Sequence, residues 1–151
     1  MRYLKPALIA EGVSDDRFLP FLLYRSLEDL CLTEFDDPVD VDQVSSLRQH
    51  QRPPNEAWLL ADGDALRSSL GVRWSDADMG VPRRPKDVEA IVDPKIPIRR
   101  LEQRRNRSIE DFFEEIAESV SLDVLREVPS FAAFERQTIS ALTDMGYRRL
   151  I

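Results

Sequence analysis

The sequence contains one cysteine, Cys31, and one histidine, His50. A single cysteine cannot form an internal disulfide, and its place on the apolar stripe of a predicted helix indicates a core residue. A single histidine excludes a histidine-rich metal site. The chain has no apolar run long enough to cross a membrane and no signal-peptide pattern, so we expect a cytoplasmic protein without membrane contact.

Positive charge is also scarce, because 21 lysine and arginine residues face 28 aspartate and glutamate residues, for a net charge of -7. Such a field disfavours wholesale coating of nucleic acid, although a local basic patch can still bind phosphate. The composition is otherwise that of a globular protein, with 42% apolar and 32% charged residues in a chain of 151 residues. We therefore expect one domain over residues 1–151, with a strand and helix core over 1–70 and a mostly helical extension over 85–151.

The most informative stretch combines a strand, a turn and a helix start within residues 7–19. The apolar run Ala7–Ala10 predicts a buried strand, Gly12 allows a tight turn, and Ser14 is suited to cap the following helix. Asp15 lies in the first helical turn, where the helix dipole favours negative charge. Glu11 then falls at the carboxyl end of a strand, where open α/β sheets bind ligands. It is either a site residue or a solvated turn residue.

This pattern of apolar strand, Glu-Gly, small residue, Asp and amphipathic helix resembles the first motif of TOPRIM domains, the metal-binding fold of topoisomerases, primases and OLD-type nucleases. The whole chain is similar to a family of small stand-alone bacterial TOPRIM-like proteins of unknown function. The resemblance implies an α/β fold with a small parallel, Rossmann-like sheet. It further implies that Glu11 acts as general acid or base and as a metal ligand, with Gly12 and Asp15 as motif residues. An Asp-x-Asp pair after a later strand holds Mg²⁺ in such proteins, and Mn²⁺ is the alternative ion.

Hydrophobic periodicity places the remaining elements of the N-terminal part. We predict one strand over residues 3–10, a helix over 14–31 with Pro20 near its start, and a half-exposed strand over 39–44. Residues 45–54 are polar and end in two prolines, so we predict a loop or a single helical turn. Asp40 and Asp42 form a literal Asp-x-Asp, which two outward carboxylates of an edge strand explain equally well.

Residues 55–66 have two incompatible interpretations. As a strand that ends in the Asp-Gly-Asp run 62–64, the segment supplies the missing metal pair. As a helix, it buries Trp58, and its lack of β-branched residues favours this interpretation. The resemblance agrees, because relatives carry a similar segment, with Glu56 and Trp58, downstream of their Asp-x-Asp strand. The chain then lacks the middle strand with the usual magnesium pair, and Asp62 and Asp64 are the substitutes to test.

The C-terminal half is predicted to be helical after a loop over residues 71–85. Asp93-Pro94-Lys95 matches a motif of the small family, and its simplest interpretation is structural: Asp93 caps the next helix and Lys95 is a surface charge. Further helices are predicted from Ser108, over 122–128, and from 129 to a glycine at 146.

Several arginines between residues 98 and 108 face one acid, Glu102, and form the strong positive patch of an acidic chain. Guanidinium forks suit phosphate, so the patch is a candidate nucleic-acid clamp. The alternative is a solvated helix face that pairs with the acidic helix next to it. The arginines are Arg99, Arg100, Arg104, Arg105 and Arg107.

Two functions follow from these observations. The first is a Mg²⁺-dependent nuclease or phosphodiesterase that acts on DNA or RNA, with Glu11 as base or ligand. The second is a non-catalytic TOPRIM-like interaction module that partners an ATPase, as in OLD-type systems, in the setting of phage defence. A third possibility is an internally deleted relative that folds poorly, which a cooperative melting transition would dismiss. The sequence does not indicate an oligomeric state.

Overall fold

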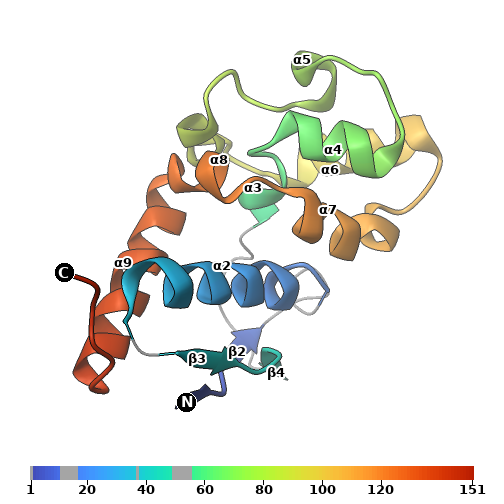
Figure 1. Cartoon of the computed structure of the whole chain (residues 1–151). Coiled ribbons are helices and arrows are strands. Elements are labelled where there is room, and N and C mark those ends of the chain that lie inside the picture. The colour runs from blue at the N-terminus through green and yellow to red at the C-terminus, as the bar shows by residue number, and fades with distance from the viewer. Residues whose placement is uncertain (1, 11–16, 37, 49–55) are drawn as a thin grey trace.

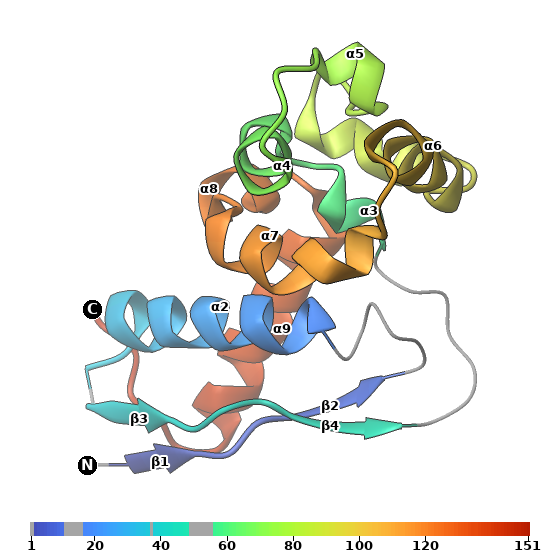
Figure 2. The ribbon, with the colours of Figure 1, turned by 90° about the vertical axis from the view of Figure 1, so that its right-hand side faces the viewer.

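The computed structural model describes residues 2–10, 17–36, 38–48 and 56–151 of the chain. Three layers follow one another: a parallel β ribbon, the long helix α2 (Leu19–Glu34) across it, and a group of shorter helices beyond α2 (Figure 1 and Figure 2). The last helix, α9 (Pro129–Asp144), runs from the helical layer past α2 toward the ribbon. The chain is therefore an α/β fold with a helical C-terminal half.

The ribbon consists of two parallel strand pairs in line with each other. Strand β1 (Arg2–Leu4) pairs with β3 (Val39–Val41), and β2 (Ala7–Ala10) pairs with β4 (Ser45–Arg48). Two residues, 5 and 6, link the strands on one side and three residues, 42–44, link them on the other, so the register shifts by one residue at the break. The break falls at Pro6, which has no backbone N–H to donate to a neighbouring strand.

Helix α2 covers one face of the ribbon. Leu27 and Cys31 of α2 pack against Val41 of β3, and Leu4 adds to this contact. The opposite face, which we call the outer face, carries Tyr3, Lys5, Asp40 and Asp42, all exposed. Tyr3 is 69% exposed. At β1 and β3, the ribbon thus has one buried face and one open face among the described side chains.

The helical layer is built from short elements that pack through one large cluster of apolar side chains. Helix α7 lies between α2 and α4, so the order through the molecule is ribbon, α2, α7 and α4 (Figure 2). Of the helices described, none is long and apolar enough to span a lipid bilayer. The elements are α3 (Glu56–Leu59), α4 (Gly63–Leu70), α5 (Asp76–Met79), η1 (Pro85–Ala90), α6 (Lys95–Arg105), η2 (Ile109–Phe112), α7 (Phe113–Ser119) and α8 (Leu122–Arg126).

The two halves of α2 belong to different apolar clusters. Phe18 and Leu22, at its N-terminal end, pack into the large cluster with the short helices. Leu27 and Cys31, in its C-terminal half, pack into a small cluster with the ribbon and with Leu142 of α9. Burial of Cys31 confirms that it is a core residue.

Several predictions about local structure are confirmed. The segment after residue 55 is helical rather than a strand, although it divides into α3 and α4. The Ser108 hydroxyl accepts a hydrogen bond from the backbone N–H of Glu110 at the start of η2. Helices occur at 122–126 and 129–144, close to the predicted ranges. Pro20 lies in the first turn of α2, where a missing N–H costs no helical hydrogen bond.

Other predictions are wrong. Residues 45–48 form strand β4 instead of a loop, because the ladder to β2 provides hydrogen bonds that local propensity does not foresee. The strand predicted over 3–10 is two strands, and the one predicted over 39–44 ends at 41. The loop over 71–85 contains α5, whose start has a capping box between Ser75 and Asp78.

A glycine at the end of α5 is sterically required. Gly80 has a φ of 73°, and a Cβ atom there would lie 2.5 Å from Cβ of Pro97 at the start of α6. Gly71, at the end of α4, has a φ of 64° but nothing within 4 Å of its would-be Cβ. Both positions favour glycine for backbone reasons, and Gly80 also allows α5 and α6 to approach closely.

Candidate functional site

Glu11, Gly12 and Asp15 lie outside the residues that the structure describes. The structure does describe what flanks them. Strand β2 ends at Ala10, parallel to β4, and α2 follows at residue 19. Residue 11 therefore follows the carboxyl end of a parallel strand in a strand–helix–strand unit, which is where open α/β sheets bind ligands. The catalytic and metal roles of Glu11 stay predictions.

Asp62 joins two helices through both of its carboxylate oxygens. Its Oδ1 accepts hydrogen bonds from the backbone N–H groups of Asp64 and Ala65, at 3.1 and 3.2 Å, and so caps α4. Its Oδ2 accepts the backbone N–H of Ser121 at 2.9 Å, just before α8. The side chain thus binds the starts of two helices, and a metal ion would have to share these oxygens.

Asp64 has a different environment. Its side chain is 93% exposed, and its Oδ1 lies 2.7 Å from Nη2 of Arg67. Arg67 also donates to Asp76 at 2.6 Å, and its hydrogen bonds to Asp64 and then to Asp76 raise the pKa of Arg67. Asp62 and Asp64 are therefore close in sequence, but Asp62 binds backbone N–H groups whereas Asp64 binds the guanidinium of Arg67. Their role as a metal pair stays a prediction.

The other residues quoted from the family motifs have structural positions. Trp58 is buried, its ring packs edge-on against Phe131 at a centroid distance of 5.1 Å, and its Nε1 donates to Oγ of Ser130 at 2.9 Å. Glu56, at the start of α3, is half-buried. These contacts explain why a tryptophan suits position 58 without any ligand.

The Asp93-Pro94-Lys95 motif opens α6 as predicted. Oδ1 of Asp93 accepts the backbone N–H of Lys95 at 3.0 Å, although the helix itself is counted from Lys95 with Pro94 before it. The Lys95 side chain is exposed. The motif is therefore a helix cap with a surface charge beside it.

Three of the five candidate arginines contact residues of the same chain. Arg104 lies over the ring of Trp74, with Cζ 4.3 Å from the ring centre, and is 3.8 Å from Asp78. Nε of Arg105 donates to the carbonyl of Leu70 at 3.1 Å. These contacts attach α6 to the preceding loop and to α4, so they lock the helix in place.

Arg107 pairs with Asp111 at 3.3 Å, which is the contact with the neighbouring acidic helix that the alternative interpretation predicted. All five arginines are exposed, and Arg99 and Arg100 differ from the other three because their side chains form no ion pair, side-chain hydrogen bond or ring contact with a described residue. If this patch binds phosphate, Arg99 and Arg100 are the residues free to do so.

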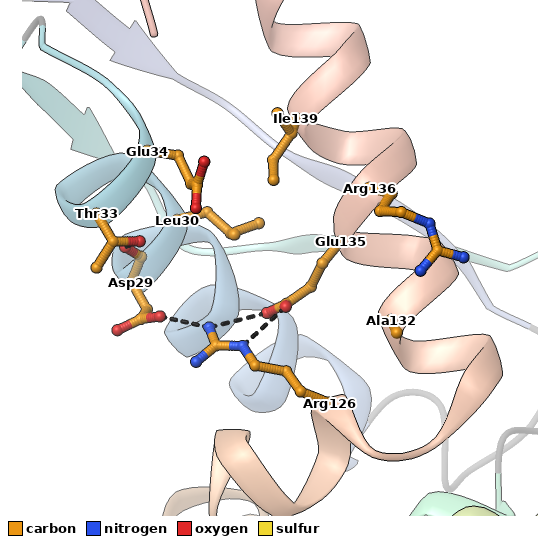
Figure 3. Close-up of a pocket in the computed structure, with 9 residues that line it drawn as sticks. All are labelled: Asp29, Leu30, Thr33, Glu34, Arg126, Ala132, Glu135, Arg136 and Ile139. Atoms are coloured by element: carbon orange, nitrogen blue, oxygen red, sulfur yellow. Dashed lines mark hydrogen bonds and ion pairs between the residues drawn. The ribbon is translucent and has the colours of Figure 1, made fainter. Parts of the chain in front are cut away.

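A pocket of about 480 Å³ between α2 and α9 was not foreseen from the sequence (Figure 3). Arg126, at the end of α8, lines this pocket, and Figure 3 shows its guanidinium between Asp29 of α2 and Glu135 of α9. Nε and Nη2 of Arg126 donate to the two oxygens of Glu135 at 2.9 and 3.1 Å. Nη2 also donates to Asp29, and Nη1 donates to Asp123 at 3.1 Å.

Arg126 forms ion pairs with three of the carboxylates around it, those of Asp29, Asp123 and Glu135. Glu135 is 7% exposed and also accepts the hydroxyl of Ser26 at 2.9 Å. The hydrogen bond to Glu135, followed by the one to Asp29, raises the pKa of Arg126. The network fastens α8 and α9 to α2, so we interpret the pocket as a structural clamp. One sequence signal could have found it, since Glu135 lies on the inward stripe of α9 between Phe131 and Leu142.

In the described part of the chain, no group of three or more histidine, cysteine, aspartate or glutamate side chains is arranged to hold a metal ion. Comparison of the chain with protein-family models, with curated proteins and with solved structures finds no match.

Proposed function

We propose that the chain is a non-catalytic, TOPRIM-like interaction module in which a partner protein completes the parallel ribbon. The observation that carries this proposal is the open outer face. Parallel sheets occur almost only where both faces are covered, because their strands are joined by crossovers that lie on the faces. Here α2 covers one face, while Tyr3 and Asp40 are exposed on the other.

The edges of the ribbon support the same conclusion. Each strand pair contains two strands in the described part of the chain, and neither pair has a third described strand beside it. An open edge is a template for strand addition, in which main-chain hydrogen bonds provide affinity. The middle strand that relatives carry is the element expected beside it. The resemblance to OLD-type systems makes an ATPase the first partner to test, in the setting of phage defence.

Site-specific photocrosslinking tests this proposal in the cells that naturally produce the protein. A benzophenone amino acid replaces Tyr3 on the outer face in one variant and Leu32 of α2 in the control. Leu32 is 79% exposed and lies on the helix rather than on the outer face. We expect a covalent adduct with another protein from position 3 and not from position 32. Equal labelling from both positions, or no adduct from position 3, would refute the proposal.

A second function is favoured by one specific observation, the parallel strand β2 that ends directly before Glu11. In this alternative the chain is a Mg²⁺-dependent phosphodiesterase of TOPRIM type. Glu11 acts as base or ligand, and Arg99 and Arg100 contact the phosphates of DNA or RNA. The ion, when bound, would lower the pKa of a water molecule and offset charge on the phosphate.

Calorimetric titration of Mg²⁺ and Mn²⁺ separates the two functions. It is carried out on the wild type, on Glu11→Gln and on Asp64→Asn, at a pH where carboxylates are ionised. Saturable heat that disappears in Glu11→Gln, followed by cleavage of DNA or RNA, would establish the enzyme. An absence of binding in the wild type would leave the interaction module as the better account.

A further inference from the structure

A groove lies along the exposed side of α2, between the ribbon and α7. Its volume is about 690 Å³, and Pro20, Phe21 and Tyr24 of α2 form its floor together with Val44, just before β4. Phe21 is 36% exposed. A second hollow of about 310 Å³ shares Phe21 and Glu114 with the first, so the two are continuous along α2. The floor is therefore an apolar and aromatic strip open to solvent.

The walls of this groove are acidic. Glu114 and Glu118 of α7 are exposed and line the groove, and Glu110 and Asp111 line its extension together with one cation, Arg17. The one cation of the main hollow is Arg25, whose Nη1 donates to the carbonyls of Ala117 and Val120 at 2.5 and 2.9 Å. Arg25 is thus bound to the end of α7, although Glu118 also acts on it through its charge. Acidic side chains outnumber cations among the described residues that line the two hollows, since Arg17 and Arg25 face four carboxylates.

Negative charges also surround Tyr24, whose ring lines the groove. The hydroxyl of Tyr24 donates to Glu28 at 2.6 Å, and this hydrogen bond is the main cause that raises the pKa of Tyr24. Asp40 and Asp42 of the ribbon raise it further by their charge. A ligand for this groove must therefore combine an apolar side chain with positive charge.

The exposed side of α6 has these properties. Ile96 is 46% exposed, and Arg99 and Arg100 follow it at spacings of three and four residues, which places all three on one face of the helix. The two arginines form no ion pair with a described residue, whereas Arg104 and Arg105 contact the same chain. The face thus presents one apolar side chain beside two guanidinium groups.

We propose that the groove binds α6 of a second copy of this chain, with Ile96 against Phe21 and with Arg99 and Arg100 opposite Glu114 and Glu118. Each copy carries both surfaces, so the contact can form in both directions. The contact does not involve Tyr3 or the outer face, so it does not depend on the function proposed above. It accounts for an exposed arginine pair in a chain whose net charge is -7.

Charge reversal and charge exchange test the proposal. Molar mass is measured by light scattering and sedimentation over a dilution series for the wild type, for R99E/R100E, for E114R/E118R and for the variant with all four changes. We expect the wild type to associate, each double reversal to weaken association at least about tenfold, and the fourfold variant to regain it. Circular dichroism verifies that each variant is folded.

The experiment also includes a control variant with the same change in net charge and a series of salt concentrations. R83E/K86E changes the net charge as much as R99E/R100E does, at exposed positions before and within η1, and should leave association unchanged. Salt should weaken wild-type association, because the screening length falls from about 10 Å at 0.1 M to about 3 Å at 1 M. A monomeric wild type at every concentration, or an equal effect of R83E/K86E, would overturn the proposal. So would loss of DNA or RNA binding in R99E/R100E with no change in molar mass.

Discussion

Replacing Asp62 by alanine should lower the free energy of unfolding by about 2–4 kcal/mol. The loss has two parts, because the carboxylate caps α4 and also accepts the backbone N–H of Ser121. Removal of an aspartate cap costs about 0.5–2 kcal/mol, and a hydrogen bond to a charged group contributes about 1.5–3 kcal/mol. The side chain is only half-buried, so we take a value below the sum of the upper limits.

Two neighbouring variants serve as controls for Asp62→Ala. Asp64→Ala removes an exposed pair with Arg67 and should cost less than about 1 kcal/mol. Asp62→Asn keeps one acceptor oxygen for α4 but loses the acceptor for Ser121, so it should fall between the two. The measurement is urea denaturation followed by far-UV circular dichroism and by tryptophan fluorescence. Coincident transitions would also show that the chain unfolds cooperatively.

The order of the three variants is what the reasoning predicts. Equal destabilisation by Asp62→Ala and Asp64→Ala would refute the double cap. If Asp62→Ala left stability unchanged in the absence of metal but abolished stabilisation by Mg²⁺, Asp62 would be a metal ligand instead. That outcome would move the balance toward the phosphodiesterase.

Three other predictions concern stability and reactivity. Arg126→Met leaves buried Glu135 without its cation and should cost about 2–3 kcal/mol, whereas R126M/E135L should lie closer to the wild type in the same denaturation assay. Gly71→Ala should cost about 1 kcal/mol, and Gly80→Ala should cost more because its Cβ also meets another side chain; equal melting temperatures would contradict this. Burial raises the pKa of Cys31, so the folded thiol should react slowly with maleimide. Above the pKa of the unfolded thiol, the unfolded state loses its proton first, so stability should fall with rising pH more steeply than in Cys31→Val.

Local signals were sufficient for most helices. Capping residues and apolar stripes mark the start at Ser108 and the stripe through Phe131, and both are confirmed. The helical propensity of residues 56–70 also prevailed over the strand interpretation. The break between α3 and α4 was not predicted, because it depends on the carboxylate of Asp62 capping a new helix within an otherwise continuous apolar pattern.

Long-range contacts account for what the sequence did not reveal. Strand β4 has no β-branched residue, and its backbone is extended because it pairs with β2, from which it is separated by α2. The second role of Asp62 depends on a partner 59 residues away, and the clamp at Arg126 joins it to Asp29, 97 residues away. Periodicity describes one element at a time, so it can mark Glu135 as inward-facing but cannot identify Ser121 or Asp29 as a partner.

Helix α2 connects the ribbon side of the molecule with the side of the short helices. Since its first half packs in the large cluster and its second half in the small one, α2 joins the two clusters. A change in packing on the ribbon side, such as a partner strand docking beside β3, would tilt a helix whose other end lies against α7. The ribbon and the groove beside Glu114 would then be thermodynamically coupled, each altering the affinity of the other for its ligand.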